Sequence, residues 1–514
     1  MNKNCRMALL GFLLLSSCSE DKGPASSSGN LVLSATPEVA AQIKNVSAAL
    51  AVTGQSATLD IIGVRTDIPM TTNPDGTVTA TVSVPLGPQS FQINYRAGTV
   101  KIFQATGQAV VVDNQPTTVS LTTTTDQFDD DGDGAKNLAE VRVGSDPKSS
   151  SSRPLVFKHI DATGTSHGCG VVDDGTVRCW GNNTAGQLGN ATTTNSATPV
   201  QVNGITNATS VATGLTHSCA RLEGGTVKCW GSNLLGSLGD GTTNDSLTPV
   251  TVVGINNAES ITVGVQYACA RLSTGTIRCW GYNSTGQLGD GTITNSPTPV
   301  QVLGITGATA VRAGPNHACA QVASITKCWG HTESLGSLGF NLVPGTTNVS
   351  TAVDVALFAP PPASSVSAAV GVLSTCLLTS VGTVYCYGDN SAGQLGDGSR
   401  TSRNLPLDPI SGINTVTLIA AGEREACAIL ADKTILCWGN NDDGQIGDGS
   451  TIDRLSPVQV AGIANATSVT VGTFHACALL TDGTVRCSGK NDKGQLGDGT
   501  TTSSAVPVTV KALQ

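Results

Sequence analysis

The 514-residue sequence lacks the features of several protein classes. It shows no long helical pattern, and nothing after its first eighteen residues approaches the eighteen-residue apolar stretch of a membrane-spanning helix, so we expect a soluble remainder. Charged residues make up 13%, and the formal net charge of −9 argues against nucleic acid as a partner. Glycine is abundant, with 60 residues. Together with frequent Thr, Ser, Asn and Val, it predicts an all-β fold of short strands and tight turns.

The N-terminus has the pattern of an export signal. Lys3 and Arg6 precede the short apolar stretch Met7 to Leu15, and the stretch ends in Leu15-Ser16-Ser17-Cys18. This ending resembles the lipobox of bacterial lipoproteins, which implies removal of residues 1–17 and acylation of Cys18. The alternative is an ordinary secretory peptide with an incidental cysteine. Acyl chains would anchor the protein to a membrane, and Ser19 favours the bacterial outer membrane or cell surface. Residues 18–30 are then a flexible tether.

Two further segments precede the repeats that fill the rest of the chain. Residues 31–124 alternate apolar and polar positions, as in Thr77-Val78-Thr79-Ala80-Thr81-Val82, and are broken by the turn Asn73-Pro74-Asp75-Gly76. This pattern predicts a small β-sandwich of immunoglobulin-like type, although it lacks cysteines and a marker tryptophan. No catalytic grouping is visible in it. Residues 125–153 form a linker with an acidic cluster.

The linker carries oxygen ligands at the spacing of a calcium loop. Asp129, Asp131, Asp133, Asn137 and Glu140 fall at loop positions 1, 3, 5, 9 and 12, Gly134 stands at the turn, and Ala135 offers its carbonyl. Lys136 departs from the EF-hand pattern, and no helix precedes the loop. The segment better resembles the calcium loops of bacterial thrombospondin type-three-like repeats. We therefore predict a structural calcium ion, with a solvated acidic linker as the alternative.

Residues 154–514 consist of one unit repeated seven times. The first cysteine of each unit stands at Cys169, Cys219, Cys269, Cys319, Cys376, Cys427 and Cys477, a spacing of about fifty residues. Each unit has the pattern of four short strands, as in Ala208 to Ala212, His217 to Leu222, Thr226 to Trp230 and Pro249 to Val253. A period of this length built from four strands predicts a seven-bladed β-propeller, preceded by the small sandwich.

A second cysteine follows the first in every unit. The predicted pairs are Cys169 with Cys179, Cys219 with Cys229, Cys269 with Cys279, Cys319 with Cys328, Cys376 with Cys386, Cys427 with Cys437, and Cys477 with Cys487. A turn such as Glu223-Gly224-Gly225 lies between them, so folding the hairpin places each pair on adjacent strands. In an exported protein such a pair is expected to form a disulfide. Zinc is the weaker alternative, because the cysteines lack the close spacing of zinc knuckles.

Two motifs identify the repeat. Cys229-Trp230-Gly231 is followed by Gly236-Ser237-Leu238-Gly239, and other units carry Gly186-Gln187-Leu188-Gly189 and close variants of it. These residues resemble the repeat of the regulator of chromosome condensation family, whose members form seven-bladed propellers. The recurring Trp180, Trp230, Trp280, Trp329 and Trp438 are expected in the core, and the leucines between the blades. Four histidines two residues before the first cysteine are expected to be structural hydrogen-bonding residues: His167, His217, His317 and His475.

No unrepeated nucleophile, base or metal cluster stands out in the repeats, so we expect a binding protein rather than an enzyme. Its partner would be an extracellular or periplasmic protein or glycan. Variable residues lie in the loop before each first cysteine and in the excursion between residues 331 and 362. The candidate partner-binding residues are Phe340, Leu342, Val343, Phe358, Glu423, Arg424 and Phe474. The family resemblance leaves two alternatives open: an inhibitor of an enzyme such as a beta-lactamase, and a guanine nucleotide exchange factor.

Overall fold

The computed structural model divides the chain into two compact units, Met1–Pro154 and Leu155–Leu513. In the first unit the structure describes the backbone of ten strands. In the second it describes residues 156–164, 166–331, 348–355, 365–406 and 408–511. None of the helices formed by these residues is long and apolar enough to cross a membrane.

The strands of the first unit form two five-stranded sheets. One sheet has the order β2-β1-β3-β7-β6, and the other has the order β10-β9-β8-β4-β5. Their bounds are β1 Asn2–Met7, β2 Leu15–Ser19, β3 Ser28–Ser34, β4 Ala57–Ile61, β5 Arg65–Pro69, β6 Thr71–Thr72, β7 Val78–Pro85, β8 Gly87–Ala97, β9 Val100–Val111 and β10 Ser120–Thr125. Cys18 falls in β2. The predicted cleavage, acylation and immunoglobulin-like sandwich stay predictions, and the calcium-loop residues 129–140 lie outside the described residues.

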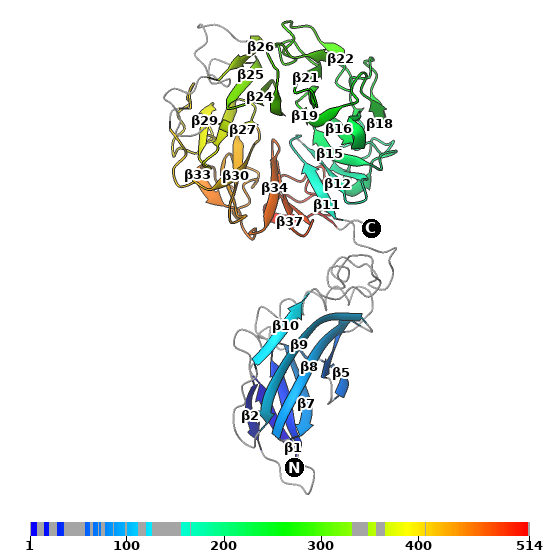
Figure 1. The fold of residues 1–514 in the computed structure, drawn as a ribbon, viewed down its shortest axis with the longest axis vertical. Coiled ribbons are helices and arrows are strands. Elements are labelled where there is room, and N and C mark those ends of the chain that lie inside the picture. Colours follow the sequence, from blue (N-terminus) through cyan, green and yellow to red (C-terminus); the bar gives the residue numbers. More distant parts are fainter. Residues whose placement is uncertain are drawn as a thin grey trace. The chain divides into compact units, whose positions relative to one another are not determined.

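The second unit is a propeller of seven antiparallel sheets, arranged radially in a ring (Figure 1). Blade 1 contains β11 Phe157–Asp161, β12 His167–Val172, β13 Val177–Gly181 and β14 Ser196–Gln201. Blade 2 contains β15 Ala208–Thr213, β16 His217–Leu222, β17 Val227–Gly231 and β18 Ser246–Thr251, with the 3-10 turn η1 Glu223–Gly225. Blade 3 contains β19 Ala258–Val263, β20 Tyr267–Leu272, β21 Ile277–Gly281 and β22 Ser296–Gln301. Blade 4 contains β23 Ala308–Ala313, β24 His317–Val322, β25 Ile325–His331 and β26 Asn348–Asp354.

Blades 5 to 7 complete the ring. Blade 5 contains β27 Ser365–Val370, β28 Ser374–Thr379 and β29 Val384–Gly388. Blade 6 contains β30 Val416–Ala421, β31 Glu425–Leu430, β32 Ile435–Gly439 and β33 Arg454–Gln459. Blade 7 contains β34 Ala466–Val471, β35 His475–Leu480, β36 Val485–Gly489 and β37 Ser504–Thr509. The prediction of a seven-bladed, all-β propeller is confirmed.

The prediction of four strands in every unit is wrong for blade 5. Its sheet has three strands, and only two isolated bridges, Tyr385 to Pro409 and Gly388 to Arg403, stand where other blades have a fourth strand. Pro409 has no N–H to donate to a strand ladder, and a further proline, Pro406, lies just before it. The outer edge of this blade is therefore an irregular segment.

The hairpin formed by the second and third strands fixes the register of each blade. In blade 2, Cys219 lies directly opposite Cys229. In unit 4 the cysteines are nine rather than ten residues apart, because its turn is one residue shorter, and Cys319 still lies opposite Cys328. The spacing of the cysteines therefore matches the geometry of the hairpin in every blade.

The structure joins all seven predicted cysteine pairs as disulfides, each with a Cα–Cα distance of 4.0 or 4.1 Å. No free cysteine occurs among the described residues of the propeller, so no thiolate is left there to bind zinc. The seven disulfides are Cys169 to Cys179, Cys219 to Cys229, Cys269 to Cys279, Cys319 to Cys328, Cys376 to Cys386, Cys427 to Cys437, and Cys477 to Cys487.

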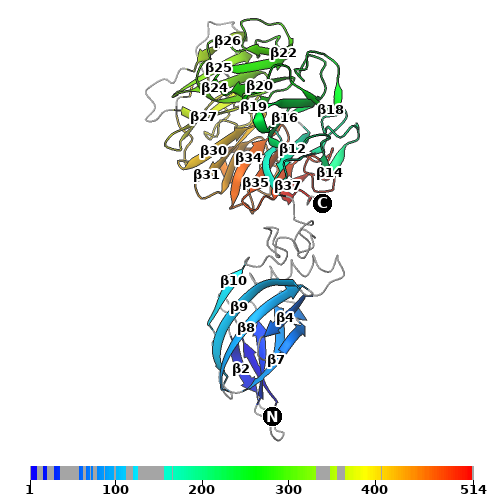
Figure 2. The same ribbon diagram turned by 45° about the vertical axis from the view of Figure 1, so that its right-hand side comes forward.

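Seven apolar clusters, one between each pair of neighbouring blades, form the core. The last of them closes the ring, because Phe157 and Trp180 of blade 1 pack with Leu496 of blade 7. Figures 1 and 2 show β11 and β34 side by side at this closure. The ring is thus closed by side-chain packing between the N-terminal and C-terminal ends of the propeller.

The five tryptophans lie in these clusters and are fully buried, as predicted. Each indole also donates a hydrogen bond to a backbone carbonyl of the preceding blade, as Trp230 Nε1 does to Gln187 O at 2.8 Å. In blade 7, Ser488 stands in the tryptophan position and donates to Gln445 O at 3.0 Å. The repeated tryptophan therefore joins adjacent blades by packing and by one buried hydrogen bond.

Candidate functional site

One face of the propeller gathers two loops from each blade. The loops that join first to second strands, which we call the inner loops, lie near the ring axis, and the loops that join third to fourth strands lie outside them. The inner loops surround a hollow of about 460 Å³ that opens to solvent. Residues from all seven blades line this hollow, so it lies on the ring axis.

A ring of glycines sets the narrowest part of this hollow. The ring consists of Gly164, Gly214, Gly264, Gly314, Gly371, Gly422 and Gly472. A Cβ added to Gly164 would lie 2.3 Å from the carbonyl oxygen of Gly214, and one added to Gly472 would lie 2.6 Å from the carbonyl oxygen of Gly164. No side chain fits in such a gap, so glycine lets the seven inner strands converge.

The residues that follow the glycines differ from blade to blade, and they line the hollow. Leu215, Val265, Pro315, Val372, Glu423 and Thr473 come from six different inner loops. The predicted ring of variable loops on one face is therefore confirmed. Its lining is mostly apolar, and Glu423 is its one charged side chain among the described residues.

The predicted partner-binding residues are only partly placed by the structure. Glu423 lines the hollow, and Arg424 is exposed beside it. Phe474 lies in the inner loop of blade 7 with 36% of its surface exposed, and the Lys490 ammonium stands 4.8 Å from its ring centroid. These residues share one sector of the face, over blades 6 and 7. Phe340, Leu342, Val343 and Phe358 lie outside the described residues.

Below the loops, the position two residues before the first cysteine forms a buried ring. It is occupied by His167, His217, Tyr267, His317, Ser374, Glu425 and His475. Two histidines bond to the next blade: His167 Nε2 pairs with Ser218 Oγ at 2.8 Å, and His317 Nε2 pairs with Thr375 Oγ1 at 3.1 Å. The structural prediction is correct for both.

The same prediction is wrong for His217 and His475. Their ring nitrogens find no hydrogen-bond partner in the described part of the chain, because the next blade presents Ala268 or Gly168 in place of a hydroxyl. Burial lowers the pKa of His217 and His475 to about 4. Burial also lowers the pKa of His167 to about 3, with help from the neighbouring histidines. All these rings are therefore neutral at pH 7.

Glu425 is the functional candidate that sequence reasoning missed. It takes the histidine position in blade 6 and is 2% exposed. Its Oε2 accepts a hydrogen bond from the Arg424 N–H at 3.2 Å, and its Oε1 has no partner among the described residues. Burial raises the pKa of this carboxyl well above its ordinary value, and the charges of Glu423 and Asp443 raise it further. An acid two residues before Cys427 was the available signal.

Three more ionisable side chains occur once each on the innermost strands. Asp161 and Arg312 both lie opposite the first cysteine of their blades, 1 and 4. Asp161 Oδ1 accepts bonds from Thr163 and from Thr213 of the next blade, the shortest at 2.6 Å from Thr213 Oγ1. Burial lowers the pKa of His159 and Arg312, and Asp161 opposes both shifts. Sequence reasoning found no unrepeated group here because these residues are far apart in the chain.

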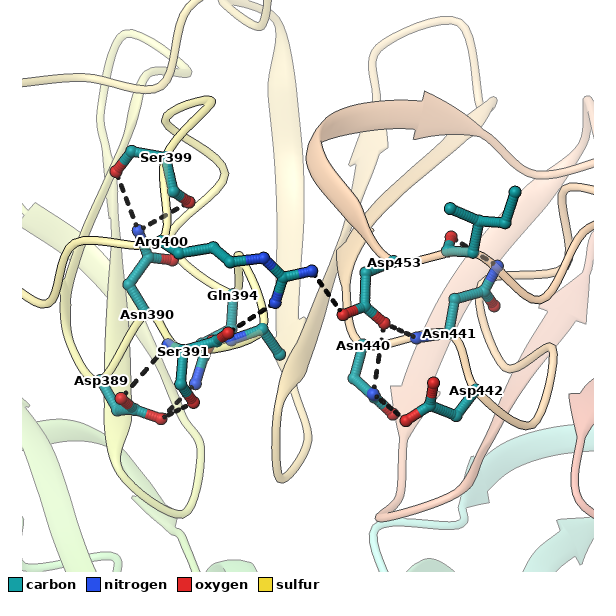
Figure 3. Close-up of polar contacts among 12 residues, drawn as sticks. Asp389, Asn390, Ser391, Gln394, Ser399, Arg400, Asn440, Asn441, Asp442 and Asp453 are labelled. Carbon is teal, nitrogen blue, oxygen red and sulfur yellow. Dashed lines mark hydrogen bonds and ion pairs between the residues drawn. The ribbon is translucent and has the colours of Figure 1, made fainter.

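The outer loops of blades 5 and 6 are joined by an ion pair (Figure 3). Arg400 Nη2 lies 2.8 Å from Asp453 Oδ2, while Asp453 Oδ1 accepts the Asn441 N–H at 3.0 Å. Asn195, Asp245 and Asn295 make the second contact in other blades. Asp453 thus performs the repeated capping role with one oxygen and ties blade 5 to blade 6 with the other.

Within the described residues, no group of three or more His, Cys, Asp or Glu side chains is placed to hold a metal ion. The chemistry available on this face is therefore recognition by an apolar hollow, two carboxylates and an exposed aromatic ring.

Comparison with known proteins gives short matches by sequence and long matches by fold. The Ultraviolet-B receptor UVR8 of Arabidopsis thaliana is 35% identical over 94 residues, which are 18% of this chain and 21% of that protein. The human X-linked retinitis pigmentosa GTPase regulator is 33% identical over 95 residues, 18% of this chain and 9% of that protein. The chain thus spans only a small part of these relatives' length.

Two solved structures show the same fold at low sequence identity. Human WBSCR16 has a TM-score of 0.57 and 19% identity, and the match covers 63% of this chain and 86% of that one. Yeast RCC1 (Prp20), solved with Kap60 bound, has a TM-score of 0.56 and 19% identity, and the match covers 70% of this chain and 84% of that one.

Two family profiles match the repeats directly, and both are described as the Regulator of chromosome condensation (RCC1) repeat. One matches residues 174–221, 274–321, 381–429 and 432–479. The other matches residues 157–187, 208–237, 258–287, 416–445 and 466–495. Together the matched segments include residues of every blade. By its repeats and by its propeller, this chain belongs to the RCC1 repeat family.

Proposed function

We propose that this protein is an exported, lipid-anchored scaffold that binds a protein partner on the face that carries the hollow. RCC1-like propellers are protein-interaction scaffolds. One observation carries the choice of face. Seven inner loops with the same backbone frame and different side chains converge on a single, mostly apolar hollow. Differences between equivalent loops give a symmetric scaffold an asymmetric recognition surface.

The disulfides support export. Fourteen cysteines form seven buried pairs, and disulfides persist in oxidising compartments. This location argues against guanine nucleotide exchange in the cytosol. Intact-mass spectrometry of membrane-extracted protein, with and without reduction, tests it: loss of residues 1–17, added acyl mass on Cys18 and fourteen protected thiols are expected. An unprocessed chain with free thiols would reject export and favour nucleotide exchange.

The binding face is tested with matched surface variants. Val265 lines the hollow and is half-buried, whereas Val381 is exposed in a hairpin on the opposite face. Partners captured from a periplasmic and surface extract on the immobilised wild-type propeller would be identified and measured against both variants. We expect Val265→Glu to lose the partner and Val381→Glu to keep it. Equal capture by both variants would refute the assignment of the face.

A further inference from the structure

We propose that the hollow takes a lysine or arginine side chain of the partner, with its alkyl stem on the apolar wall and its cationic head at Glu423 and Glu425. The proposal deepens the protein-binding function above and rests on it. It names the chemistry of the partner's central contact: a cation carried on an unbranched aliphatic chain.

The wall of the hollow suits an alkyl stem. Val263, Val370 and Val471 line it beside Leu215 and Val265. These side chains offer no hydrogen bond to a ligand, so a methylene chain loses nothing by lying against them. A polar or short cationic group alone would leave this surface unfilled.

The two carboxyl groups lie at one sector of the hollow. Glu423 belongs to the lining, next to Gly422. The unpartnered Oε1 of the buried Glu425 lies 3.0 Å from the position of a Cβ on Gly422, so it faces the same stretch of the lining. A buried carboxyl oxygen without a partner is destabilising unless something completes its hydrogen bonding. An ammonium or guanidinium at this point would do so.

The protein itself supplies no cation to this pair. Within the described ranges, no ion pair joins Glu423 or Glu425 to a basic side chain, and the charges that act on Glu425 are those of Glu423 and Asp443, both negative. The histidine at the same position of the next blade, His475, is neutral at pH 7 because burial lowers its pKa to about 4. The sector therefore favours a cation and disfavours an anion.

Three six-carbon probes test the proposal on the intact protein by isothermal titration calorimetry: n-hexylammonium, 1-hexanol and hexanoate. We expect hexylammonium to bind at least about tenfold more tightly than the other two. Glu423→Gln and Glu425→Gln should each weaken hexylammonium about tenfold. Glu223→Gln is the matched control, since it removes the same charge from an exposed hairpin on the opposite face, and it should bind as the wild type does.

A pH series separates a direct role of Glu425 from a structural one. Ionised Glu425 attracts the probe and protonated Glu425 does not, so wild-type affinity should rise between about pH 6 and 8.5, while Glu425→Gln should show a flatter profile. If Glu425→Gln does not fold, Glu423→Gln and the probe comparison still decide. Equal binding of hexanol and hexylammonium, or unchanged binding in Glu423→Gln, would overturn the cation pocket. Partner capture that stays sensitive to Val265→Glu would leave the proposed function standing in that case.

Discussion

Four buried histidines predict that the propeller loses stability in mild acid. His167, His217, His317 and His475 are fully buried, and their pKa values are lowered to about 3 or 4 by burial. A lowered folded-state pKa means that the unfolded chain takes up the proton first, at its ordinary value of about 6.5. The stabilisation is therefore complete above pH 6.5 and is lost as the pH falls toward 4. Between pH 7 and pH 5 each histidine costs about 1.8 kcal/mol of unfolding free energy, or about 7 kcal/mol for four.

One histidine can be isolated by substitution. Equilibrium unfolding in guanidinium chloride, with disulfides intact and followed by the fluorescence of the buried tryptophans, gives the free energy of unfolding at each pH. We expect His217→Gln to reduce the loss between pH 7 and pH 5 by about 1.8 kcal/mol relative to wild type. Glu425 shifts stability in the opposite direction, because its raised pKa favours the folded state in acid, but it is common to both proteins.

The control uses the same position in blade 3. Tyr267 donates to Gly314 O at 2.9 Å and to His317 O at 2.7 Å, and burial raises its pKa well above its ordinary value. Tyr267→Phe should lower stability at both pH values and leave the difference between them unchanged. If His217→Gln loses as much stability as wild type between pH 7 and pH 5, the neutral, buried histidine ring is refuted.

Three further outcomes follow from the contacts between blades. Trp438→Phe loses the 3.0 Å bond to the preceding blade and should lower the free energy of unfolding by about 1–3 kcal/mol in the same denaturation assay. Arg400 and Asp453 form a half-exposed ion pair, so a double-mutant cycle with Arg400→Ala and Asp453→Asn should give a coupling of about 0.5 kcal/mol, and zero coupling would show that the pair contributes nothing. Gly264→Ala places a Cβ 2.7 Å from the Gly314 carbonyl oxygen and should cost about 1–3 kcal/mol, whereas an unchanged midpoint would refute the close approach of the inner strands.

Much of the propeller could be predicted because its determinants are local. The hairpin between Cys219 and Cys229 has a turn of fixed length, so sequence spacing alone places the two sulfur atoms opposite one another. The tryptophan after the second cysteine was recognised as core because it recurs at one position. Repetition turns a weak strand pattern into a strong one, since the same error would have to occur seven times.

The candidate site was predicted in outline and missed in detail. The variable loops that contain Glu423 and Phe474 were identified from differences between repeats. Glu425 was missed, although it interrupts a column of histidines, because its burial and its unpartnered oxygen depend on packing against blade 7. The fourth strand of blade 5 was expected from the repeat, but the ladder is broken around Pro409.

The sequence by itself determined the repeat, the hairpins and the cysteine pairs, because each depends on residues within about ten positions of one another. The tertiary structure decided how the seven units meet. Closure of the ring brings Phe157 against Leu496, the glycines together around the axis, and the inner loops around one hollow. The physical reason is that closure is set by packing between opposite ends of the propeller sequence, and no local pattern specifies which side chains then share a surface.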